Sequence, residues 1–506
     1  MMSIQLKNQI KGMLIACLFL PSVATAQNEL DALRYSQTMI GPTARSLAMG
    51  GAFGALGGDY TCLSTNPAGL GIYRKSDFSL SLGFAGRNYK SDFEGIRTLD
   101  DRFDVDIPNL GVVLASGSKK DGGAGSGIAF GIAYNRLASF NNSITFKGRN
   151  EENSILDSFL ENINANGGTS SDQFFDLYPF DGDLAYQTFL INPTAADPNI
   201  YSSVIPNGGI SQSMSIESSG YMGEFSLGMA GKVDDYVFVG LSLGFPNIDY
   251  EENKSYSETD DDGTVFLNDT SLTYRDFRAL RYDNYLRTTG NGFNMKAGVL
   301  VMPVDWLRIG LAVHSPTWFF MSDIYSSRMQ SDFVNGSFDY TSPEGNYTYK
   351  LNTSWRSIAS MGFVFGKSAL LSIEGEMVQY PRAKLKASDY NFQEENLAIN
   401  TQFKTSTFNF RAGGEWRYEP FAVRAGISYY GSPFVSNLMD SKTDQSMLGY
   451  SGGVGYRGEK YYLYLGFVVN ERGEKHETYS LKDEPVPFAT IKRNETRVVV
   501  TFGKKF

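Results

Sequence analysis

Hydrophobic and polar residues alternate with a period of two from Phe78 to the end of the chain. In the first such segment Phe78, Leu80, Leu82 and Phe84 share one face, and the residues between them are Ser, Ser and Gly. This pattern predicts a β-strand with one apolar face and one small, polar face. With tolerance for Gly, the same alternation recurs near residues 107–116, 127–138, 220–232, 236–249, 289–302, 307–318, 354–366, 369–380, 406–417, 421–432, 446–457, 460–470 and 494–502. The prediction is an all-β chain of about 14 strands.

Short and long connections alternate between these strands. The short ones are 232–235, 303–305, 366–368, 417–420 and 457–459, with 116–126 as a longer version. The long ones are polar and lie at 139–219, 250–288, 319–353, 381–405, 433–445 and 471–493. Tight turns at one end and long polar loops at the other are typical of a transmembrane antiparallel β-barrel, with turns in the periplasm and loops outside. A soluble sandwich or propeller shows the same alternation and is the alternative.

The positions of the tryptophans favour the barrel. All four fall at predicted strand ends, namely Trp306, Trp318, Trp355 and Trp416. Trp and Tyr gather at the two interfaces of a membrane, where an apolar ring with a polar tip is stable. An interfacial girdle therefore explains them more simply than four unrelated core residues.

The first 26 residues have the parts of a secretory signal peptide. Lys7 and Lys11 precede an apolar run at 13–23, and Ala24-Thr25-Ala26 offers a small-residue cleavage site. The alternative is a lipoprotein processing box that ends at Cys17. No later segment reaches about 18 consecutive apolar residues, so no transmembrane helix is expected. We expect export through the general secretory route and a place in the cell outer membrane of a Gram-negative bacterium.

Composition excludes one class of partner. With 45 Lys plus Arg against 55 Asp plus Glu, the net charge is -10, which gives no electrostatic source of affinity for nucleic acid. Cleavage after Ala26 would leave Cys62 as the one remaining cysteine, so an intramolecular disulfide is not expected.

Residues 27–75 differ from the rest because they are rich in Gly and Ala and do not alternate. A plug inside a barrel brings its backbone close to the wall, which Gly and Ala permit. Pro67 restricts Asn66 to extended or turn conformations. An ordinary turn at Asn66-Pro67 is the alternative reading. The domain prediction is a hatch at 27–75 and a barrel at 76–506.

Several motifs carry a family resemblance. Residues 44–52 (ARSLAMGGA), followed by Asn66-Pro67-Ala68-Gly69-Leu70, resemble the N-terminal hatch of the FadL/TodX family, which transports long-chain fatty acids and other hydrophobic compounds across outer membranes. The resemblance continues at 130–137, 292–294 and 305–312. It implies a 14-stranded barrel plugged by its N-terminal segment, with Asn66, Pro67, Ala68 and Gly69 in the hatch. It also implies ligand uptake from outside and, as in the best-understood members, a sideways exit through the wall.

Ionisable residues occupy the predicted inward face of three consecutive strands. They are Glu374, Glu376, Arg411, Glu415 and Arg424. Charges at membrane depth are costly unless they are paired or hydrated, so each is a candidate functional residue. One interpretation is an ion-pair network that anchors the hatch. The other is transient pairing of an arginine with the carboxylate of a transported fatty acid.

The loop expected before the sixth strand mixes arginine with aromatic residues. Arg275, Phe277, Arg278, Arg281 and Tyr282 form the candidate loop for ligand uptake. Guanidinium groups beside aromatic rings could receive an amphipathic anion. Binding of outer-leaflet phosphates and an amphipathic surface helix are the alternatives.

Catalysis has little support in the sequence. The two histidines, His314 and His476, are far apart, and Ser315 beside His314 would point to the opposite face of a strand. The acidic run at 260–263 lacks the Glu that an EF-hand loop needs at its twelfth position. We expect no catalytic residues, no metal and no cofactor.

Two functions of different classes follow. The first is passive, hatch-gated transport of a fatty acid-like hydrophobic molecule. The second is a PorV-like docking or shuttle component of a protein secretion system, for which the long segment 139–219 could serve as a binding loop. Further expected partners are outer-membrane lipid and the barrel assembly machinery, since the last strand ends in Phe506.

Overall fold

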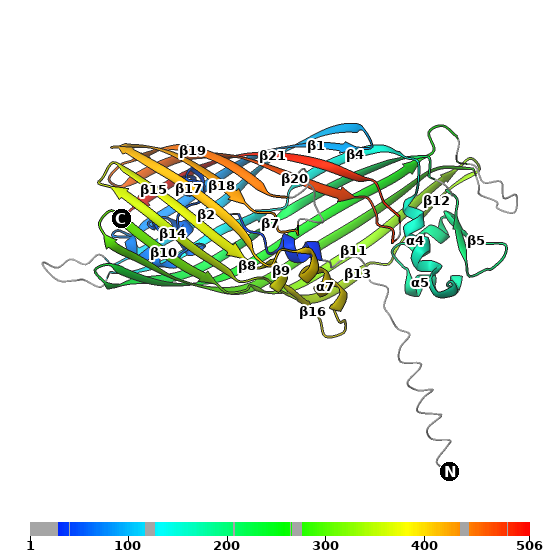
Figure 1. Cartoon of the computed structure of the whole chain (residues 1–506), viewed down its shortest axis with the longest axis horizontal. Coiled ribbons are helices and arrows are strands. Elements are labelled where there is room, and N and C mark those ends of the chain that lie inside the picture. Colours follow the sequence, from blue (N-terminus) through cyan, green and yellow to red (C-terminus); the bar gives the residue numbers. More distant parts are fainter. Residues whose placement is uncertain are drawn as a thin grey trace, which may run out of the picture.

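The computed structural model describes residues 29–39, 41–116, 127–205, 208–263, 265, 276–435, 445–482 and 484–506 (Figure 1). The predicted signal peptide, most of the connection at 116–126 and the candidate residue Arg275 lie outside these ranges.

Among the described residues, fourteen antiparallel strands close into a barrel, as predicted. They are β1 (Asp77–Phe93), β2 (Ile96–Ala115), β3 (Ile128–Ser139), β7 (Ile210–Asp234), β8 (Val237–Thr259), β9 (Phe277–Val304), β10 (Leu307–His314), β14 (Arg356–Phe365), β15 (Ala369–Val378), β17 (Thr407–Tyr418), β18 (Phe421–Tyr430), β19 (Met447–Arg457), β20 (Tyr461–Glu477) and β21 (Phe488–Lys505). The pairing of β1 with β21 along their length closes the wall. Short turns join the strands at one end, which we call the turn end and which lies at the left in Figure 1.

The wall extends well beyond the predicted strands at the other end. There β4 (Asn142–Asn150) pairs with β7, and β11 (Trp318–Phe333) pairs with β9. The remaining strands of this extension are β12 (Gly336–Thr341), β13 (Gly345–Asn352) and β16 (Lys384–Lys386). Most of the described residues in the segments 250–288, 319–353 and 471–493, which we expected to be loops, are therefore strand.

The reason for this difference is visible in β8. Near the turn end its outward residues Val239, Leu241 and Leu243 are exposed, and Gly240 and Ser242 face inward. Beyond Asn247 the outward residues are polar, and the inward ones include buried Ile, Tyr and Glu side chains. The period of two continues, but its polarity reverses. Strands predicted from an apolar outward face therefore end too early in the sequence.

A small domain fills the mouth at the end opposite the turns, and we call it the cap (residues 151–205). It contains α4 (Ile155–Ile163), η3 (Ala165–Gly167), η4 (Ser171–Gln173), α5 (Phe174–Leu177), α6 (Gly182–Gln187) and the hairpin β5 (Ile191–Pro193) and β6 (Tyr201–Ser203). Its buried residues form one apolar cluster with inward residues of the surrounding strands, including Phe93, Phe277 and Met329. Figure 1 shows α4 and α5 at that end.

Helix α4 begins where its sequence dictates. Ser154 accepts a hydrogen bond from the Leu156 N–H, and Asp157 accepts one from the Ser154 N–H, which is a capping box. The predicted loop 139–219 thus contains a folded domain that is built into the barrel.

The N-terminal segment (29–39 and 41–75), which we call the hatch segment, is packed against the wall from inside. Its elements are α2 (Glu29–Arg34), α3 (Ala44–Ala48), η1 (Tyr60–Leu63) and η2 (Pro67–Ile72). Helix α2 packs in a second apolar cluster with η5 (Tyr380–Arg382) and α7 (Gln393–Gln402). In the same hatch segment, α3 contacts strands β18–β21, and η2 contacts strands β7–β9. No helix of the described ranges is long and apolar enough to cross a membrane.

Candidate functional site

Asn66 fastens the hatch segment to itself and to the wall. Its Nδ2 donates to the Gly54 carbonyl at 2.8 Å and to the Val299 carbonyl of β9 at 3.1 Å. Its Oδ1 accepts the Ala68 N–H at 3.1 Å, so it also caps η2, which has Pro67 in its first turn. Asn66, Ala68 and their neighbours Pro67 and Gly69 are buried. An ordinary surface turn at Asn66-Pro67 would not form the hydrogen bond to Val299 of the wall.

Wall glycines let the hatch segment approach this closely. A Cβ added to Gly298 would lie 2.0 Å from Asn66 Oδ1, and one added to Gly413 would lie 2.2 Å from the Met49 carbonyl oxygen. Both distances are far below contact, so only Gly fits at these inward positions. The alternating pattern of the sequence contains these glycines, but nothing in it says which of them meet the plug.

Two glutamates of β15 hold an arginine of β17. Arg411 Nη1 lies 2.8 Å from Glu374 Oε1, and Arg411 also pairs with Glu376. Glu374 accepts the Gly54 N–H of the hatch segment at 2.7 Å. Arg356 pairs with Glu376 at 3.1 Å and donates to the Thr38 hydroxyl at 2.7 Å. This cluster therefore joins the wall to two stretches of the hatch segment.

A second cluster centres on Glu415. Its carboxylate lies 2.6 Å from Arg424, 2.5 Å from Arg417 and 3.0 Å from Arg45 of α3. Glu415 and Arg424 are buried. Since all five candidate lumen residues already have partners in the wall or the hatch segment, their geometry favours anchoring of the plug over capture of a free carboxylate.

The candidate uptake residues do not form a loop. Phe277, Arg278, Arg281 and Tyr282 belong to β9, where neighbouring residues point to opposite faces. Phe277 is buried in the cap cluster, and the Tyr282 hydroxyl donates to the Phe180 carbonyl at 2.8 Å. Arg278 and Arg281 are exposed. Among the described residues the strand therefore places these two rings and these two arginines on different faces, and a role of this segment in ligand uptake stays a prediction.

The family resemblance implies an opening in the wall but not its place, and the structure shows an interruption at β2. Strand β2 pairs with β1 along its length, but its pairing with β3 ends at Asn109 and Asn135. Beyond that point β4 pairs with β7, and no described backbone ladder joins residues 96–108 to β3 or β4. We call this interruption the wall gap.

Pro108 lies at the start of the wall gap. The pairing of β1 with β2 shifts between Ser81 and Gly83, which places a bulge beside Pro108. Proline cannot donate a ladder hydrogen bond and is found at bulges and edges. The exposed apolar residues change from odd positions such as Val105 to even positions such as Val112 across it. That switch of parity is the signal in the sequence that could have located the gap.

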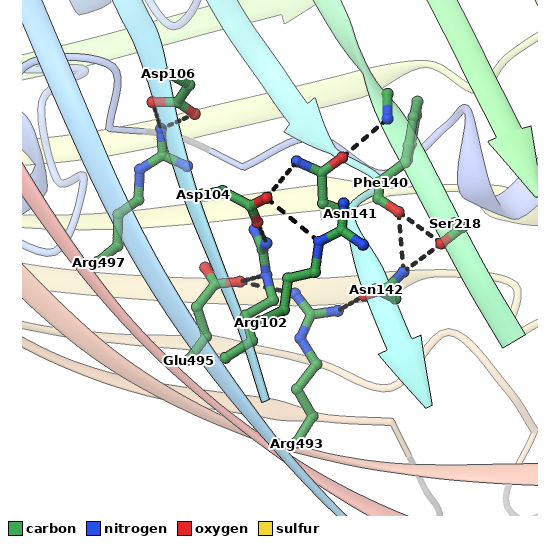
Figure 2. A network of polar contacts seen from close by, with 12 residues as sticks. Arg102, Asp104, Asp106, Phe140, Asn141, Asn142, Ser218, Arg493, Glu495 and Arg497 are labelled. Atoms are coloured by element: carbon green, nitrogen blue, oxygen red, sulfur yellow. Dashed lines mark hydrogen bonds and ion pairs between the residues drawn. The ribbon is translucent and has the colours of Figure 1, made fainter. Parts of the chain in front are cut away.

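Polar side chains close the wall gap in place of backbone (Figure 2). Arg136 Nε of β3 lies 3.5 Å from Asp106 Oδ2 of β2, and Asn141 Nδ2 donates to Asp104 Oδ1 at 2.9 Å. Nearby, Asp100 accepts the Thr145 N–H at 2.8 Å. Side-chain contacts can separate without dismantling a ladder. We call this set the latch.

Two small cavities lie beside the latch inside the barrel. One of about 50 Å³ is lined by residues that include Met39, Pro108, Arg136 and Arg497. The other, of about 60 Å³, shares Met39 and Arg136 and reaches His314. The hatch segment, the two cavities and the wall gap are therefore adjacent.

The histidine next to Ser315 has a structural partner. His314 Nε2 lies 2.6 Å from the Thr65 carbonyl oxygen, whereas the Ser315 hydroxyl donates to the Pro316 carbonyl at 2.8 Å. The two side chains do not form a nucleophile and base.

The buried carboxyl of Glu258 fixes the cap to β8. It accepts hydrogen bonds from the Ser154 hydroxyl at 2.5 Å and the Ile155 N–H at 2.9 Å. Burial raises the pKa of Glu258 to about 7, because these donors are neutral and only partly replace water. It lies at the cap end of its strand, far beyond the outward apolar residues.

The fold has known counterparts. The structure superposes on a Pseudomonas aeruginosa FadL homologue with a TM-score of 0.53 and 11% identity, over 92% of this chain and 99% of that one. It superposes on the Pseudomonas putida toluene transporter TodX with a TM-score of 0.51 and 11% identity, over 93% and 100%. The sequence matches no protein-family model and no curated protein. The chain therefore has a FadL/TodX-like fold, as its hatch and strand motifs suggested.

Proposed function

We propose that this chain is an outer-membrane channel for the passive passage of hydrophobic small molecules of the fatty-acid type. The molecule enters from the cap end, moves past the hatch segment and leaves sideways through the wall gap. The wall gap carries this proposal, because there no described backbone ladder separates the lumen from the outside of the wall. The proposed passage uses no nucleotide and no cofactor.

An apolar band around the barrel supports the membrane location. Outward residues of many strands near the turn end are large, apolar and exposed, for example Leu241 at 60%, Leu311 at 58% and Val423 at 58%. A soluble protein rarely exposes so much contiguous apolar surface, whereas lipid stabilises it. The printed names of the structural counterparts, a FadL homologue and a toluene transporter, agree with a hydrophobic cargo.

Passage requires movement. The two cavities beside the latch hold about 60 and 50 Å³, below the roughly 300–1,000 Å³ of typical small-molecule sites. We propose that the latch and the hatch segment next to it shift together when a ligand arrives. Each latch contact is an ion pair or hydrogen bond with at least one side chain, and such contacts exchange with water more readily than a backbone ladder.

A reversible cross-link across the wall gap tests the proposal. The double variant Asp104→Cys/Asn141→Cys replaces two side chains that are in contact across the gap. Oxidation should stop uptake of labelled palmitate and of toluene by Gram-negative cells that lack their own transporter, and a reductant should restore it. The native Cys62 is buried and does not compete.

The matched control is Asp92→Cys/Arg97→Cys. These residues face each other in the β1–β2 hairpin, which is already held by its ladder, so their cross-link should leave uptake unchanged. Full uptake by the cross-linked gap variant would contradict a sideways exit. Loss of uptake in both variants would indicate a general effect of oxidation.

A further inference from the structure

A second, larger cavity opens at the turn end and is distinct from the wall gap. It lies between the outer part of the hatch segment and the strand ends, and has a volume of about 500 Å³. That volume is within the range of small-molecule sites, roughly 300–1,000 Å³. We call it the vestibule.

The vestibule is cationic although the chain as a whole is acidic. Seven Lys and Arg side chains and three carboxylates line it among the described residues, against a net charge of -10 for the whole chain. Besides Arg45, the cations are Arg74, Lys75, Arg308, Arg417, Arg457 and Lys505.

The carboxylates of the vestibule do not neutralise these cations. Asp77 accepts hydrogen bonds from the hydroxyls of Tyr60 at 3.0 Å and Tyr462 at 2.8 Å. Asp59 accepts hydrogen bonds from the Thr43 hydroxyl and from Thr61. The third carboxylate, Glu459, is exposed at the rim. Two of the three acidic groups are therefore already satisfied by neutral donors.

Arg308 is the clearest unsatisfied cation. Its Nη1 donates to the Leu56 carbonyl at 2.8 Å, but its buried Nε has no hydrogen-bond partner. Within the described residues, no carboxylate lies within ion-pair distance of Arg308, Arg74 or Lys75. A guanidinium group with free donors in a cavity matches a carboxylate or phosphate.

One part of the remaining lining is apolar. Leu56, Ile72 and Tyr73 of the hatch segment and Leu370 of β15 face the same cavity. A free inorganic anion would pair with the cations but leave this apolar surface exposed to water. A molecule that has both a charged head and an alkyl chain uses both.

We propose that the vestibule binds the anionic head group, carboxylate or phosphate, of a single-chain amphiphile. The alkyl chain lies along Leu56, Ile72 and Tyr73. The inference rests on the proposed function for the supply of such a molecule, and it assigns a binding site at the turn end of the barrel, separate from the sideways exit.

Two variants test the site in the full-length protein in non-ionic detergent. Arg308→Gln removes the unsatisfied guanidinium group, and Arg74→Gln/Lys75→Gln removes two exposed cations. The probes are palmitate, hexadecyl phosphate, hexadecanol and inorganic phosphate, with affinities measured by calorimetry. Each variant should lower the affinity for palmitate and for hexadecyl phosphate by about tenfold, the effect of one lost charge-assisted contact. Binding of hexadecanol should not change.

The matched control is Arg328→Gln, an exposed arginine of β11 that pairs with Asp339 outside the vestibule. It should leave all four affinities unchanged. If Arg308→Gln fails to fold, as seen from its mobility in unheated gels, the exposed double variant still decides. Equal palmitate affinity in the wild type and the folded variants overturns the proposal. So does an affinity for inorganic phosphate equal to that for hexadecyl phosphate, because the apolar lining would then be irrelevant.

The outcome is separable from the proposed function. Uptake of toluene, which has no charge, depends on the wall gap and not on the vestibule. Palmitate binding that requires Arg308, together with uptake that ignores the gap cross-link, would refute the sideways exit alone. Gap-dependent uptake with palmitate binding unchanged in the variants would refute the vestibule site alone.

Discussion

The barrel is closed twice, by the hatch segment inside the lumen and by the cap at the end opposite the turns, and the two closures are built differently. The hatch segment is held by polar bonds between its backbone and the wall, such as Gly54 to Glu374 at 2.7 Å and Ala44 to Thr501 at 2.8 Å. The cap is held by aromatic rings, such as Phe180 on Tyr325 at 4.8 Å and Phe189 on Phe338 at 4.7 Å.

The difference bears on how each closure yields. Buried ion pairs are costly to break singly, because the remaining charge is left unpaired. Apolar packing has no such directional requirement and can slide over an apolar ligand. The cap is thus suited to admit a hydrophobic molecule, and the hatch segment is suited to keep most of its wall contacts while the part beside the latch shifts with it.

The largest expected effect comes from Glu415→Gln. The substitution leaves Arg45, Arg417 and Arg424 without their shared counter-ion. Loss of one partner of a buried ion pair costs about 3–5 kcal/mol. We expect the free energy of local opening of the hatch segment to fall by that amount, while the barrel remains folded. Hydrogen exchange of peptides from 44–58 measures it, and conductance in planar bilayers should rise.

Glu471→Gln is the control for this prediction. Glu471 forms an exposed pair with Lys492, with 58% and 51% of the two side chains accessible. Exposed pairs contribute about 0–1 kcal/mol. Unchanged exchange of the hatch segment in Glu415→Gln would show that the arginine cluster does not hold the plug.

A comparable break in the cap is Phe174→Ala. Phe174 is fully buried and packs on Tyr201 with ring centroids 4.8 Å apart and on Tyr186 at 5.2 Å. Truncation of a buried Phe costs about 3–5 kcal/mol of stability. The cap lies at the mouth of the barrel, where neighbouring residues can collapse into the cavity, so we expect a cost at the lower limit. We expect faster proteolysis within 155–205 and faster ligand uptake. Its neighbour Phe175, 56% exposed, is the control, and equal proteolysis of the two variants would contradict the packing argument.

The sequence predicts one of these closures better than the other. Period-two alternation gives the barrel, and the Gly/Ala-rich segment with Asn66-Pro67 gives the plug. Alternation also puts Glu374, Glu376 and Arg411 on the inward face, although it says nothing of their contacts with Gly54 or Thr38.

The cap and the wall gap are beyond such reasoning for physical reasons. Outside the apolar band, strands such as β9 carry polar residues outward and apolar ones inward, so they read as loops. The gap depends on which strands fail to pair, and a single strand's pattern does not contain its partner. Only the parity switch at Pro108 leaves a trace in the sequence.

A smaller effect should follow from pH. The pKa of Glu258 is raised by burial to about 7 from an ordinary value of 4.5. The folded cap therefore binds this proton more tightly than the opened cap, so its stability is full below about pH 4.5 and falls as the pH rises through about 7. We expect a loss on the order of 2 kcal/mol between about pH 5 and pH 8, measured by hydrogen exchange of α4. Hydrogen exchange of the hatch segment should not show this pH dependence.

Glu258→Gln sharpens this prediction because Gln does not titrate, keeps one oxygen to accept the Ile155 N–H, and can donate from its NH2 group to the Ser154 hydroxyl oxygen. Its cap should show flat exchange over that pH range. Glu152→Gln, an exposed carboxyl of the same segment, should retain the wild-type profile. A pH-dependent cap in Glu258→Gln would assign the titration to another group.

The smallest effect separates the two faces of β9. Tyr282→Phe removes the hydroxyl that donates to the Phe180 carbonyl of the cap, which should cost about 1 kcal/mol of cap stability and increase exchange near 180. The adjacent Arg281→Gln changes an exposed side chain that pairs with Asp283 at 2.8 Å, so it should alter neither the cap nor uptake. Reduced uptake in Arg281→Gln would restore this arginine as a ligand contact. Since Tyr282 faces the cap and Arg281 faces away, the inner face of β9 alone should govern the cap, which is a sharper statement than the mixed loop that its sequence suggests.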